Sequence, residues 1–275
     1  MKFNPAIKWS GSKRAQSTEI LSFITKDKYD IYYEPFCGGC SVLFQILHSH
    51  IKFNRYVCSD INLDLINLWN EIKNNPETII ENYDLLWNEL NKDKNIKRKV
   101  DFYNCIRTRF NDNKSPSDFM FLMRTAVNGM PRYNSKGNFN TSFHLTRNGI
   151  IPDKFKKDII IWSNAIKNVD FIHCNYTAIA PNVNDFIYFD PPYYNTKGMY
   201  FGGIKLNEFW EYLAKCNCDY ILSFDGRTNF NDKTYSVPEN LYNRHVYTES
   251  ANSSFRRTLQ DSSKVYVQES LYIKV

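Results

Sequence analysis

The stretch that most constrains the fold of this 275-residue chain is a strand, a glycine turn and a helix in direct succession. Residues 29–34 alternate and are rich in aromatic and β-branched side chains, which predicts a strand. The strand runs into Glu34-Pro35-Phe36-Cys37-Gly38-Gly39-Cys40-Ser41, and apolar residues at 42–47 then follow at helical spacing. This order is typical of the first βα unit of a nucleotide-binding α/β fold, where glycine lets a ligand approach the backbone closely. The dinucleotide pattern G-x-G-x-x-G is absent.

A second predicted strand, residues 55–59, ends at Asp60. An acid at a strand end about 20 residues after a glycine turn can accept hydrogen bonds from a ribose diol. The turn and Asp60 together therefore predict a cofactor that contains adenosine. Phe36 and Gly38, in the turn itself, are further candidates for contact with it.

A third predicted strand, residues 186–189, is apolar and is followed at once by Asp190-Pro191-Pro192-Tyr193. An acid at the carboxyl end of a buried strand lies where open α/β sheets bind ligands. Prolines offer no N–H donor and restrict the backbone, so carbonyl oxygens and one carboxylate face the same space. The tyrosine adds a flat stacking surface. Such a group of acceptors suits a planar substrate with an NH2 group, and an exposed nucleic-acid base is one.

The rest of the chain alternates between a helical part and an α/β part. Helical spacing covers residues 63–110 and 119–125, and the spacing of residues 155–166 and 206–215 also predicts helices. Further strands are expected at residues 169–174, at 220–224 ending in Asp225-Gly226, and as a strand or hairpin at 265–275. Asn175 and Tyr176 follow the first of these strands, where an amide and a ring could contact a purine.

Residues 128–143 alternate aromatic with cationic and amide side chains around a Lys136-Gly137 turn, which predicts an exposed β-hairpin. Arginine and asparagine are suited to bidentate contacts with guanine and adenine. A solvated hairpin without a ligand explains the same composition equally well. Near the amino terminus, Lys8-Trp9-Ser10-Gly11-Ser12-Lys13 precedes a helical pattern and could hold an anion, although an ordinary cationic loop is the alternative.

Charge and cysteine content set wider bounds. The net charge of +6 is compatible with a polyanionic partner without requiring one. Seven cysteines, no signal peptide and no apolar run of membrane-spanning length lead us to expect reduced thiols in a cytoplasmic protein, with no membrane partner. Cys37-x-x-Cys40 with Cys216-x-Cys218 could be imagined as a zinc site, but the glycine turn explains the first pair better, so we expect no metal.

In combination, these motifs resemble the Dam-type, α-ordered D12 class of DNA adenine-N6 methyltransferases over nearly the whole chain. The parts that carry the resemblance are Lys8-Trp9-x-Gly11-x-Lys13, Glu34-Pro35-Phe36-x-Gly38-Gly39, Asp60-Ile61-Asn62, the run from Arg124-Thr125-x-x-Asn128-Gly129 through Arg132, Asn134 and Lys136-Gly137 to Phe143, and Asp190-Pro191-Pro192-Tyr193 with Thr196 and Tyr200.

The resemblance implies a Rossmann-like mixed-sheet methyltransferase domain, residues 1–62 and 152–275, with an inserted helical target-recognition domain, residues 63–151, that carries the β-hairpin. It implies S-adenosyl-L-methionine as cofactor and a flipped-out adenine in double-stranded DNA as substrate. The implied catalytic residues are Asp190, Pro191, Pro192 and Tyr193. The implied cofactor-binding residues are Trp9, Lys13, Phe36, Gly38, Asp60, Asn175, Tyr176 and Asp190. The implied DNA-binding residues are Arg124, Asn128, Arg132, Asn134 and Lys136.

Several points stay open at this stage. The family usually has glycine where this chain has Cys40, and a cysteine disfavours positive φ there. Methylation of another planar amine, such as cytosine N4, RNA adenine or a protein glutamine amide, is one alternative, and a DNA-binding relative without turnover is another. We expect a monomer. GATC is the commonest target in families that the chain resembles, and the sequence tells neither the target nor whether a restriction endonuclease accompanies the enzyme.

Overall fold

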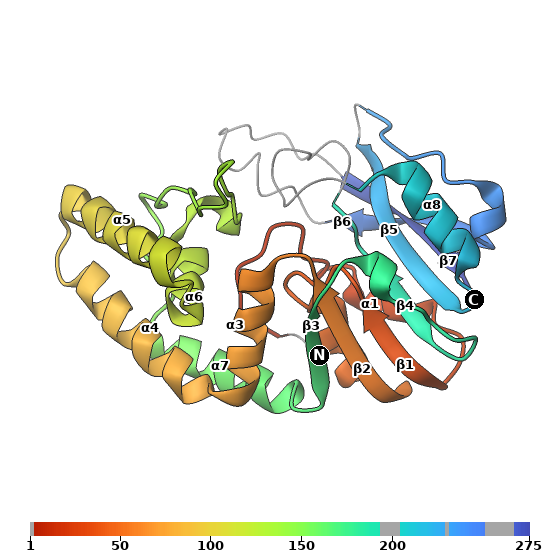
Figure 1. Cartoon of the computed structure of the whole chain (residues 1–275), viewed down its shortest axis with the longest axis horizontal. Helices are drawn as coiled ribbons and strands as arrows, with labels where there is room; N and C mark the ends of the chain where they lie inside the picture. Colours follow the sequence, from red (N-terminus) through yellow and green to blue (C-terminus); the bar gives the residue numbers. More distant parts are fainter. Residues whose placement is uncertain (1–2, 193–203, 229–230, 251–266) are drawn as a thin grey trace. The chain divides into compact units, whose positions relative to one another are not determined.

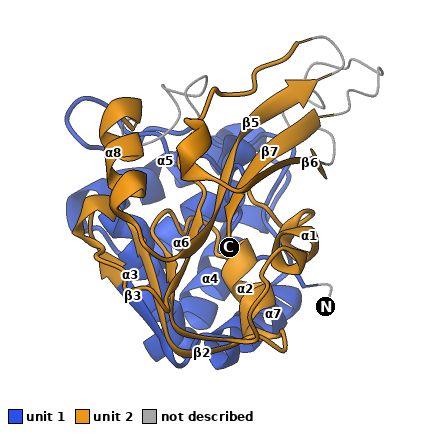
Figure 2. Ribbon diagram, turned by 90° about the vertical axis from the view of Figure 1, so that its right-hand side faces the viewer, with its two compact units in different colours: residues 1–11, 62–171, 199–201 blue, residues 12–61, 172–198, 202–275 orange. Residues whose placement is uncertain are grey.

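A computed structural model describes residues 3–192, 204–228, 231–250 and 267–275 (Figure 1). Tyr193, Thr196 and Tyr200, singled out in the sequence, lie outside the described residues. The chain divides into two compact units, coloured separately in Figure 2. The described residues of unit 1 are 3–11 and 62–171, and the rest belong to unit 2. Residues 152–171, which the sequence grouped with the catalytic domain, cluster with unit 1.

A seven-stranded sheet has the order β3-β2-β1-β4-β5-β7-β6. The strands are β1 Lys28–Glu34, β2 Lys52–Asp60, β3 Val169–His173, β4 Phe186–Phe189, β5 Asp219–Thr228, β6 Arg244–Ser250 and β7 Val267–Lys274. β1 pairs in parallel with β2 and β4, and β4 pairs in parallel with β5, whereas β7 is antiparallel to both β5 and β6. The predicted α/β class with a Rossmann-like mixed sheet is confirmed. β3 crosses the boundary between the two units.

The helices of unit 2 are short: α1 Ser17–Ser22, α2 Ser41–Leu47, α8 Leu206–Lys215 and the 3₁₀ turns η2 Tyr176–Ala178 and η4 Glu239–Leu241. α8 buries Phe209 and Leu213 in one cluster with apolar residues of β4, β5 and β7. The cluster fixes one face of the sheet, because apolar burial is the main favourable term in folding. β4 is buried along its whole length, which matches its continuous apolar sequence.

Unit 1 is helical, with α3 Leu63–Asn74, α4 Pro76–Asn91, α5 Ile96–Asn113, α6 Pro116–Thr125, η1 Val127–Gly129 and α7 Pro152–Ala165. Local signals start these helices. The side chains of Asn62, Asn95 and Ser115 cap α3, α5 and α6, and proline occupies the first turn of α4, α6 and α7. In the described part of the chain, no helix is both long and apolar enough to cross a membrane.

The predicted β-hairpin follows α6 as a chain reversal closed by two isolated antiparallel bridges, Ala126 with Phe143 and Tyr133 with Phe139. Asn134 builds its tip, since its side-chain oxygen accepts hydrogen bonds from the backbone N–H groups of Lys136 and Asn138. Gly137 has φ of +75°, which glycine adopts at no steric cost. Phe139 and Phe143 anchor the reversal in the core of unit 1.

Besides small differences in where strands begin and end, such as β2 starting at Lys52 and not at residue 55, the sheet differs from the sequence prediction at β5 and β6. β5 does not end at Asp225-Gly226 but continues to Thr228, with a shift in its register against β7 between Phe224 and Arg227. β6 was not predicted at all. Its sequence, Arg-His-Val-Tyr-Thr-Glu-Ser, is mostly polar because it lies at the edge of the sheet, so it lacks the apolar alternation that marks a half-buried strand.

Candidate active site

The candidate site lies where the order of the sheet reverses. β1 and β4 are neighbours in the sheet but not in the sequence, and both run in the same direction. In open α/β sheets, ligands bind outside the carboxyl ends of the strands at such a switch point. β1 ends at Glu34 and leads into the glycine turn, and β4 ends at Phe189 and leads into Asp190. The two stretches that the sequence singled out thus both lie at the carboxyl ends of neighbouring central strands.

Asp190 carries a carboxylate that is 19% exposed, and Pro191 after it is buried. Lys13 provides the opposite charge. Its side chain is only 4% exposed, and its ammonium lies 2.7 Å from Oδ1 and 2.9 Å from Oδ2 of Asp190. A second carboxylate, that of Glu269 on β7, is 3.5 Å from the same ammonium. A buried ammonium is costly unless it is paired, and here two carboxylates face one cation.

Glu34 is fully buried below this cluster. Its Oε2 accepts hydrogen bonds from the Tyr32 hydroxyl at 2.6 Å and from the backbone N–H of Leu43 at 3.0 Å. Leu43 lies in the first turn of α2, whose N-cap residue makes no side-chain cap, so Glu34 satisfies a helix N–H in its place. Burial raises the pKa of the Glu34 carboxyl to about 8, and the nearby Asp190 adds to the rise.

The glycine turn has the left-handed backbone that its sequence suggested. Gly38 has φ of +44°, and its N–H donates to Oδ2 of Asp60 at 3.3 Å. Asp60 is the last residue of β2, so one hydrogen bond ties the turn to the acid predicted to bind a ribose. Cys40 also has positive φ, +52°, and is the N-cap of α2. Its thiol is completely buried, and burial raises its pKa well above the ordinary value.

Aromatic side chains lie next to the glycine turn, at the carboxyl ends of the central strands. The Phe36 ring lies 5.5 Å from that of Tyr176 and 6.2 Å from that of Phe209, between ring centroids. Tyr176 is 7% exposed, so most of its ring belongs to the apolar cluster under α8. Asn175 caps the turn η2, where its side-chain oxygen accepts from the N–H of Thr177 at 3.1 Å. Lys13, Phe36, Gly38, Asp60, Asn175, Tyr176 and Asp190 all belong to unit 2, whereas the half-buried Trp9 belongs to unit 1.

Among the predicted DNA contacts, Arg124 is wrong. Its side chain is buried, and its guanidinium donates to the backbone carbonyls of Pro5 and Ala6. It therefore ties the amino-terminal segment to α6 within unit 1. Arg132, Asn134 and Lys136 are exposed along the hairpin, and Asn128 is half-buried in a left-handed conformation with φ of +57°.

The cysteines form no metal centre among the described residues, in which no three His, Cys, Asp or Glu side chains gather to hold an ion. Cys37 and Cys40 are buried together near Cys58. Cys216 and Cys218 interact instead with Tyr212. The two pairs imagined as one zinc site thus have different neighbours.

Comparison with known proteins identifies the family. The model for the D12 class N6 adenine-specific DNA methyltransferases matches residues 9–269. The chain belongs to this family. A D12 methyltransferase acts on adenine N6 in DNA, which requires an acceptor for the amine and a methyl donor, and the cluster around Asp190 beside a nucleotide-type turn agrees with both needs.

Relatives with assigned names agree with the family. Type II methyltransferase M.MjaIII of Methanocaldococcus jannaschii is 34% identical over 206 residues, which cover 70% of each chain. The DNA adenine methylase of Haemophilus influenzae is 32% identical, over 70% of this chain and 65% of its own. Type II methyltransferase M.CviBI of a Paramecium bursaria Chlorella virus is 27% identical over 89% of this chain and 88% of its own. A solved rRNA methyltransferase, AviRa of Streptomyces viridochromogenes, aligns over 99% of this chain and 86% of its own, with a TM-score of 0.39 at 9% identity.

The residues at the carboxyl ends of the central strands fit the methyl donor of a D12 methyltransferase by their chemistry. The Asp60 carboxylate at the end of β2 has the chemistry to accept hydrogen bonds from a diol, and Phe36 offers an apolar ring in the glycine turn. The group of Lys13, Asp190 and Glu269 carries one positive and two negative charges, so it favours a cationic ligand. The donor set would therefore accept a nucleoside that bears a sulfonium.

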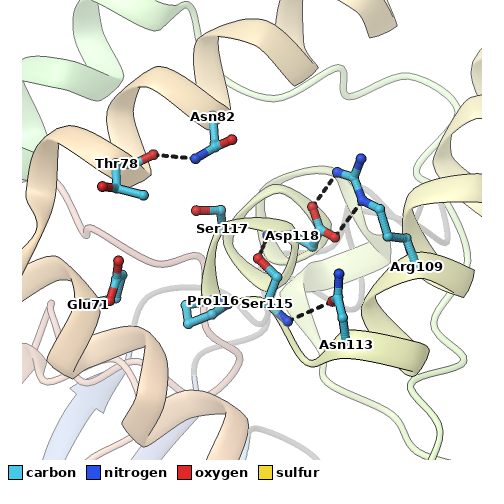
Figure 3. A pocket seen from close by; sticks show the side chains of 9 residues that line it. All are labelled: Glu71, Thr78, Asn82, Arg109, Asn113, Ser115, Pro116, Ser117 and Asp118. Atoms are coloured by element: carbon cyan, nitrogen blue, oxygen red, sulfur yellow. Dashed lines mark hydrogen bonds and ion pairs between the residues drawn. The ribbon is translucent and has the colours of Figure 1, made fainter.

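Unit 1 of the D12 methyltransferase has an open cavity of about 430 Å³ between α3, α4, α5 and α6 (Figure 3). Arg109 and Asp118 form a two-bonded ion pair at its wall, with Nε to Oδ2 at 2.8 Å and Nη2 to Oδ1 at 2.5 Å. Glu71 adds another carboxylate to the lining. The cavity lacks the predicted site residues, and its carboxylates would repel a phosphate.

Sequence reasoning missed Glu269 as a member of the site. Its strand was predicted, but nothing in the local pattern indicates that this carboxylate meets Lys13 near the other end of the chain. Glu34 was recognised only as part of a motif, and its role as a buried acceptor for α2 comes from the structure. An acid next to a proline at a strand end was the signal that could have suggested it.

Proposed function

We propose that this chain transfers a methyl group from S-adenosyl-L-methionine to the N6 amine of an adenine that is flipped out of duplex DNA. The observation that carries the proposal is the position and pairing of the Asp190 carboxylate. Its partly exposed carboxylate stands at the switch point of the sheet, on a buried strand, paired with a buried ammonium. Family membership supplies the substrate class, adenine in DNA.

The proposed chemistry explains why an acceptor cluster is needed. The lone pair of the adenine amine is delocalised into the ring, so the amine is a weak nucleophile. The Asp190 carboxylate and the Pro191 carbonyl would accept hydrogen bonds from the two N–H groups of the amine. They would thus favour a pyramidal nitrogen with its lone pair directed at the methyl group. The cofactor, when bound, supplies a methyl group on a positively charged sulfur. The amine nitrogen would form the N–C bond as the C–S bond breaks with its electron pair going to sulfur, and the nitrogen would then release a proton to water.

The charges around Asp190 support this role. Nitrogen becomes positive during the transfer, and a carboxylate at hydrogen-bond distance stabilises that charge without moving. Lys13 holds Asp190 in place in the absence of substrate. The buried Glu34 maintains the turn of α2 beside it. Tyr193, by its position after Pro192, would stack on the flipped base, whose unstacking costs a few kcal/mol.

For the cofactor, we propose that Asp60 accepts from the ribose hydroxyls and that Gly38 leaves room for the methionine part. Phe36 and Asn175 would contact the purine, and Tyr176 would support Phe36 from the core. Trp9 and Lys13 complete the proposed set. The Cys40 side chain is fully buried, so we expect it not to obstruct the cofactor.

For DNA, we propose that residues 63–151 form the target-recognition domain and that residues 1–62 and 152–275 form the catalytic domain. The exposed Arg132 and Lys136 would contact phosphates or bases, with Asn134 shaping the hairpin that presents them. Asn128, at the base of the hairpin, is a candidate for base contact. Phosphate contacts fix the register of the protein, and base contacts specify the sequence.

The experiment that tests the proposal is expression in a host without DNA methylation, followed by sequencing that maps modified adenines. We expect N6-methyladenine at one short sequence, with GATC as the target to examine first. Tritium transfer from labelled cofactor to unmodified DNA measures the rate. Cofactor binding without transfer would favour a DNA-binding relative without turnover. Label on cytosine or on RNA would contradict adenine in DNA as the substrate. We also propose a monomer, which sedimentation tests, and a restriction endonuclease partner, which requires cleavage of the unmethylated target.

A further inference from the structure

We propose that Glu269 is a positioning residue for methyl transfer, which acts on Asp190 through Lys13. The inference rests on the proposed function. Glu269 is on β7, and its carboxylate lies 3.5 Å from the Lys13 ammonium, which lies 2.7 Å from Asp190. Asp190 is thus the closer of these two carboxylates to the ammonium, and Glu269 is the more distant. The side chain of Glu269 is only 15% exposed, so its charge is weakly screened.

An irregularity in the sheet lies opposite Glu269. Phe224 of β5 is opposite Ser270 of β7, and Arg227 is opposite Gln268. Two residues of β5, Asp225 and Gly226, therefore face the single residue Glu269. Two residues against one is a β-bulge, which bends the strand and redirects side chains, and bulges are frequent next to active sites. The described pairings of β5 with β7 shift register at this bulge.

Gly226 is required for the bulge. A Cβ atom added there would lie 2.1 Å from the carbonyl oxygen of Gln268 and 2.9 Å from the carbonyl carbon of Glu269. Both are backbone atoms, which cannot rotate away. The Asp-Gly pair, which is a turn signal in many sequences, is used here to bring the β7 backbone close to β5 at Glu269.

The charge balance explains what Glu269 would do. A carboxylate held tightly by an ammonium is a poorer acceptor for the adenine amine, because the cation withdraws its charge. When the amine arrives, Lys13 must loosen its contact with Asp190. Glu269 offers the buried ammonium a second opposite charge 3.5 Å away, so Lys13 keeps a charged partner during the shift. Glu34 and Tyr188 are further ionisable groups close enough to Asp190 for its charge to raise their pKa values.

The test compares Glu269→Gln with Glu249→Gln, an exposed carboxylate on the neighbouring strand β6. We expect Glu269→Gln to lower kcat about tenfold, an effect of the size that imperfect positioning produces. The KM for DNA and the equilibrium binding of S-adenosyl-L-methionine should stay within twofold. Glu249→Gln should match the wild type in all three. Glu269→Asp, which restores the charge on a shorter side chain, should recover part of the loss.

The pH profile of kcat distinguishes positioning from a structural role. Removing a negative charge near Asp190 favours the ionised carboxylate, so its pKa falls and the acid limb should move to lower pH in Glu269→Gln. Glu249→Gln should leave the limb in place. An unchanged kcat and acid limb in Glu269→Gln would overturn the inference, as would a loss of kcat that only follows the loss of folded protein.

Gly226→Ala tests the role of Glu269 in a second way, by disturbing the bulge that lies opposite it. If it folds, kcat should fall, and the double variant with Glu269→Gln should be no slower than the slower single variant, because both changes remove one function. Additive losses would argue against a shared role. Active wild-type enzyme with an equally active Glu269→Gln refutes this inference alone, whereas an inactive wild-type enzyme refutes the proposed function as well.

Discussion

At the scale of single residues, the proposed catalytic residue Asp190 also has a structural role. Its carboxylate lies closer to the buried Lys13 ammonium than that of Glu269 does. We predict that Asp190→Ala abolishes transfer, with at least a thousandfold loss, because the amine loses its charged acceptor. The same change should lower the free energy of unfolding by about 1–3 kcal/mol, since a buried charge loses a hydrogen-bonded partner.

Tritium transfer and urea unfolding measure the two effects of Asp190→Ala separately. DNA binding by the hairpin should persist, and it serves as the control for folding. Asp190→Asn keeps the size of the side chain but not its charge, so it should be slow as well and more stable than Asp190→Ala. Transfer by Asp190→Ala above one-hundredth of the wild-type rate would show that another group accepts the amine.

Cys40 is a second residue at which two effects compete. A side chain at φ of +52° costs about 1–2 kcal/mol, but the thiol is fully buried and contributes a similar amount. We therefore predict that Cys40→Gly changes the unfolding free energy by less than about 1 kcal/mol. Cys40→Val, which has a β-branched side chain of similar size, should destabilise by about 2 kcal/mol or more. Urea unfolding of both variants measures the difference, and a Cys40→Val protein as stable as the wild type would contradict the left-handed N-cap.

At the scale of elements, Glu34 couples β1 to α2 through a carboxyl whose pKa burial raises from 4.5 to about 8. Between these values the folded protein holds a proton that the unfolded chain has released, so stability falls as pH rises through this window. We predict that Glu34→Gln removes this slope. The variant should gain stability relative to the wild type from pH 5 to pH 8, on the order of 1.4 kcal/mol for each pH unit.

Unfolding free energies at several pH values test the Glu34 prediction. Glu239, a carboxylate in the exposed turn η4, offers the matched control, and Glu239→Gln should keep the wild-type slope. Parallel curves for wild type and Glu34→Gln over the whole window would mean that Glu34 is ionised in the folded protein.

The elements also show where sequence reasoning succeeds. Residues 186–189 and 206–215 were predicted with the bounds that the structure has, because a continuous apolar run and a helical period are local signals. The bulge at Asp225-Gly226 and the edge strand β6 were not predicted, because each depends on a partner strand. An Asp-Gly pair reads as a turn unless β7 is known to lie beside it.

At the scale of the whole molecule, the same distinction separates the members of the site. Lys13, Gly38, Asp60 and Asp190 could be singled out because strand ends and glycine turns mark them locally. Glu269 could not, because its contact with Lys13 is made only by the folded sheet. Arg124 was misassigned for a related reason: its pattern does not tell whether an arginine faces solvent or, as here, the backbone carbonyls of Pro5 and Ala6.

Two arginines of unit 1, one exposed and one buried, lead to opposite predictions for the intact protein, whose net charge is +6. Arg132 is exposed on the hairpin together with Lys136, so replacing both with Ala should weaken DNA binding. Each side chain that binds a phosphate displaces about one counterion, so the slope of log K against log salt should fall by about 1 for each phosphate that the variant no longer binds. Lys157→Ala, an exposed cation on α7, is the matched control and should leave the slope unchanged.

Arg124→Met should show the opposite behaviour. The buried guanidinium satisfies two backbone carbonyls, so its removal should lower the unfolding free energy by about 2–4 kcal/mol while the salt slope of the folded protein stays at the wild-type value. Fluorescence anisotropy with a DNA duplex across a salt series, corrected for the folded fraction, measures both. A reduced slope for Arg124→Met with normal stability would return Arg124 to the DNA interface, and an unchanged slope for the hairpin variant would remove the hairpin from it.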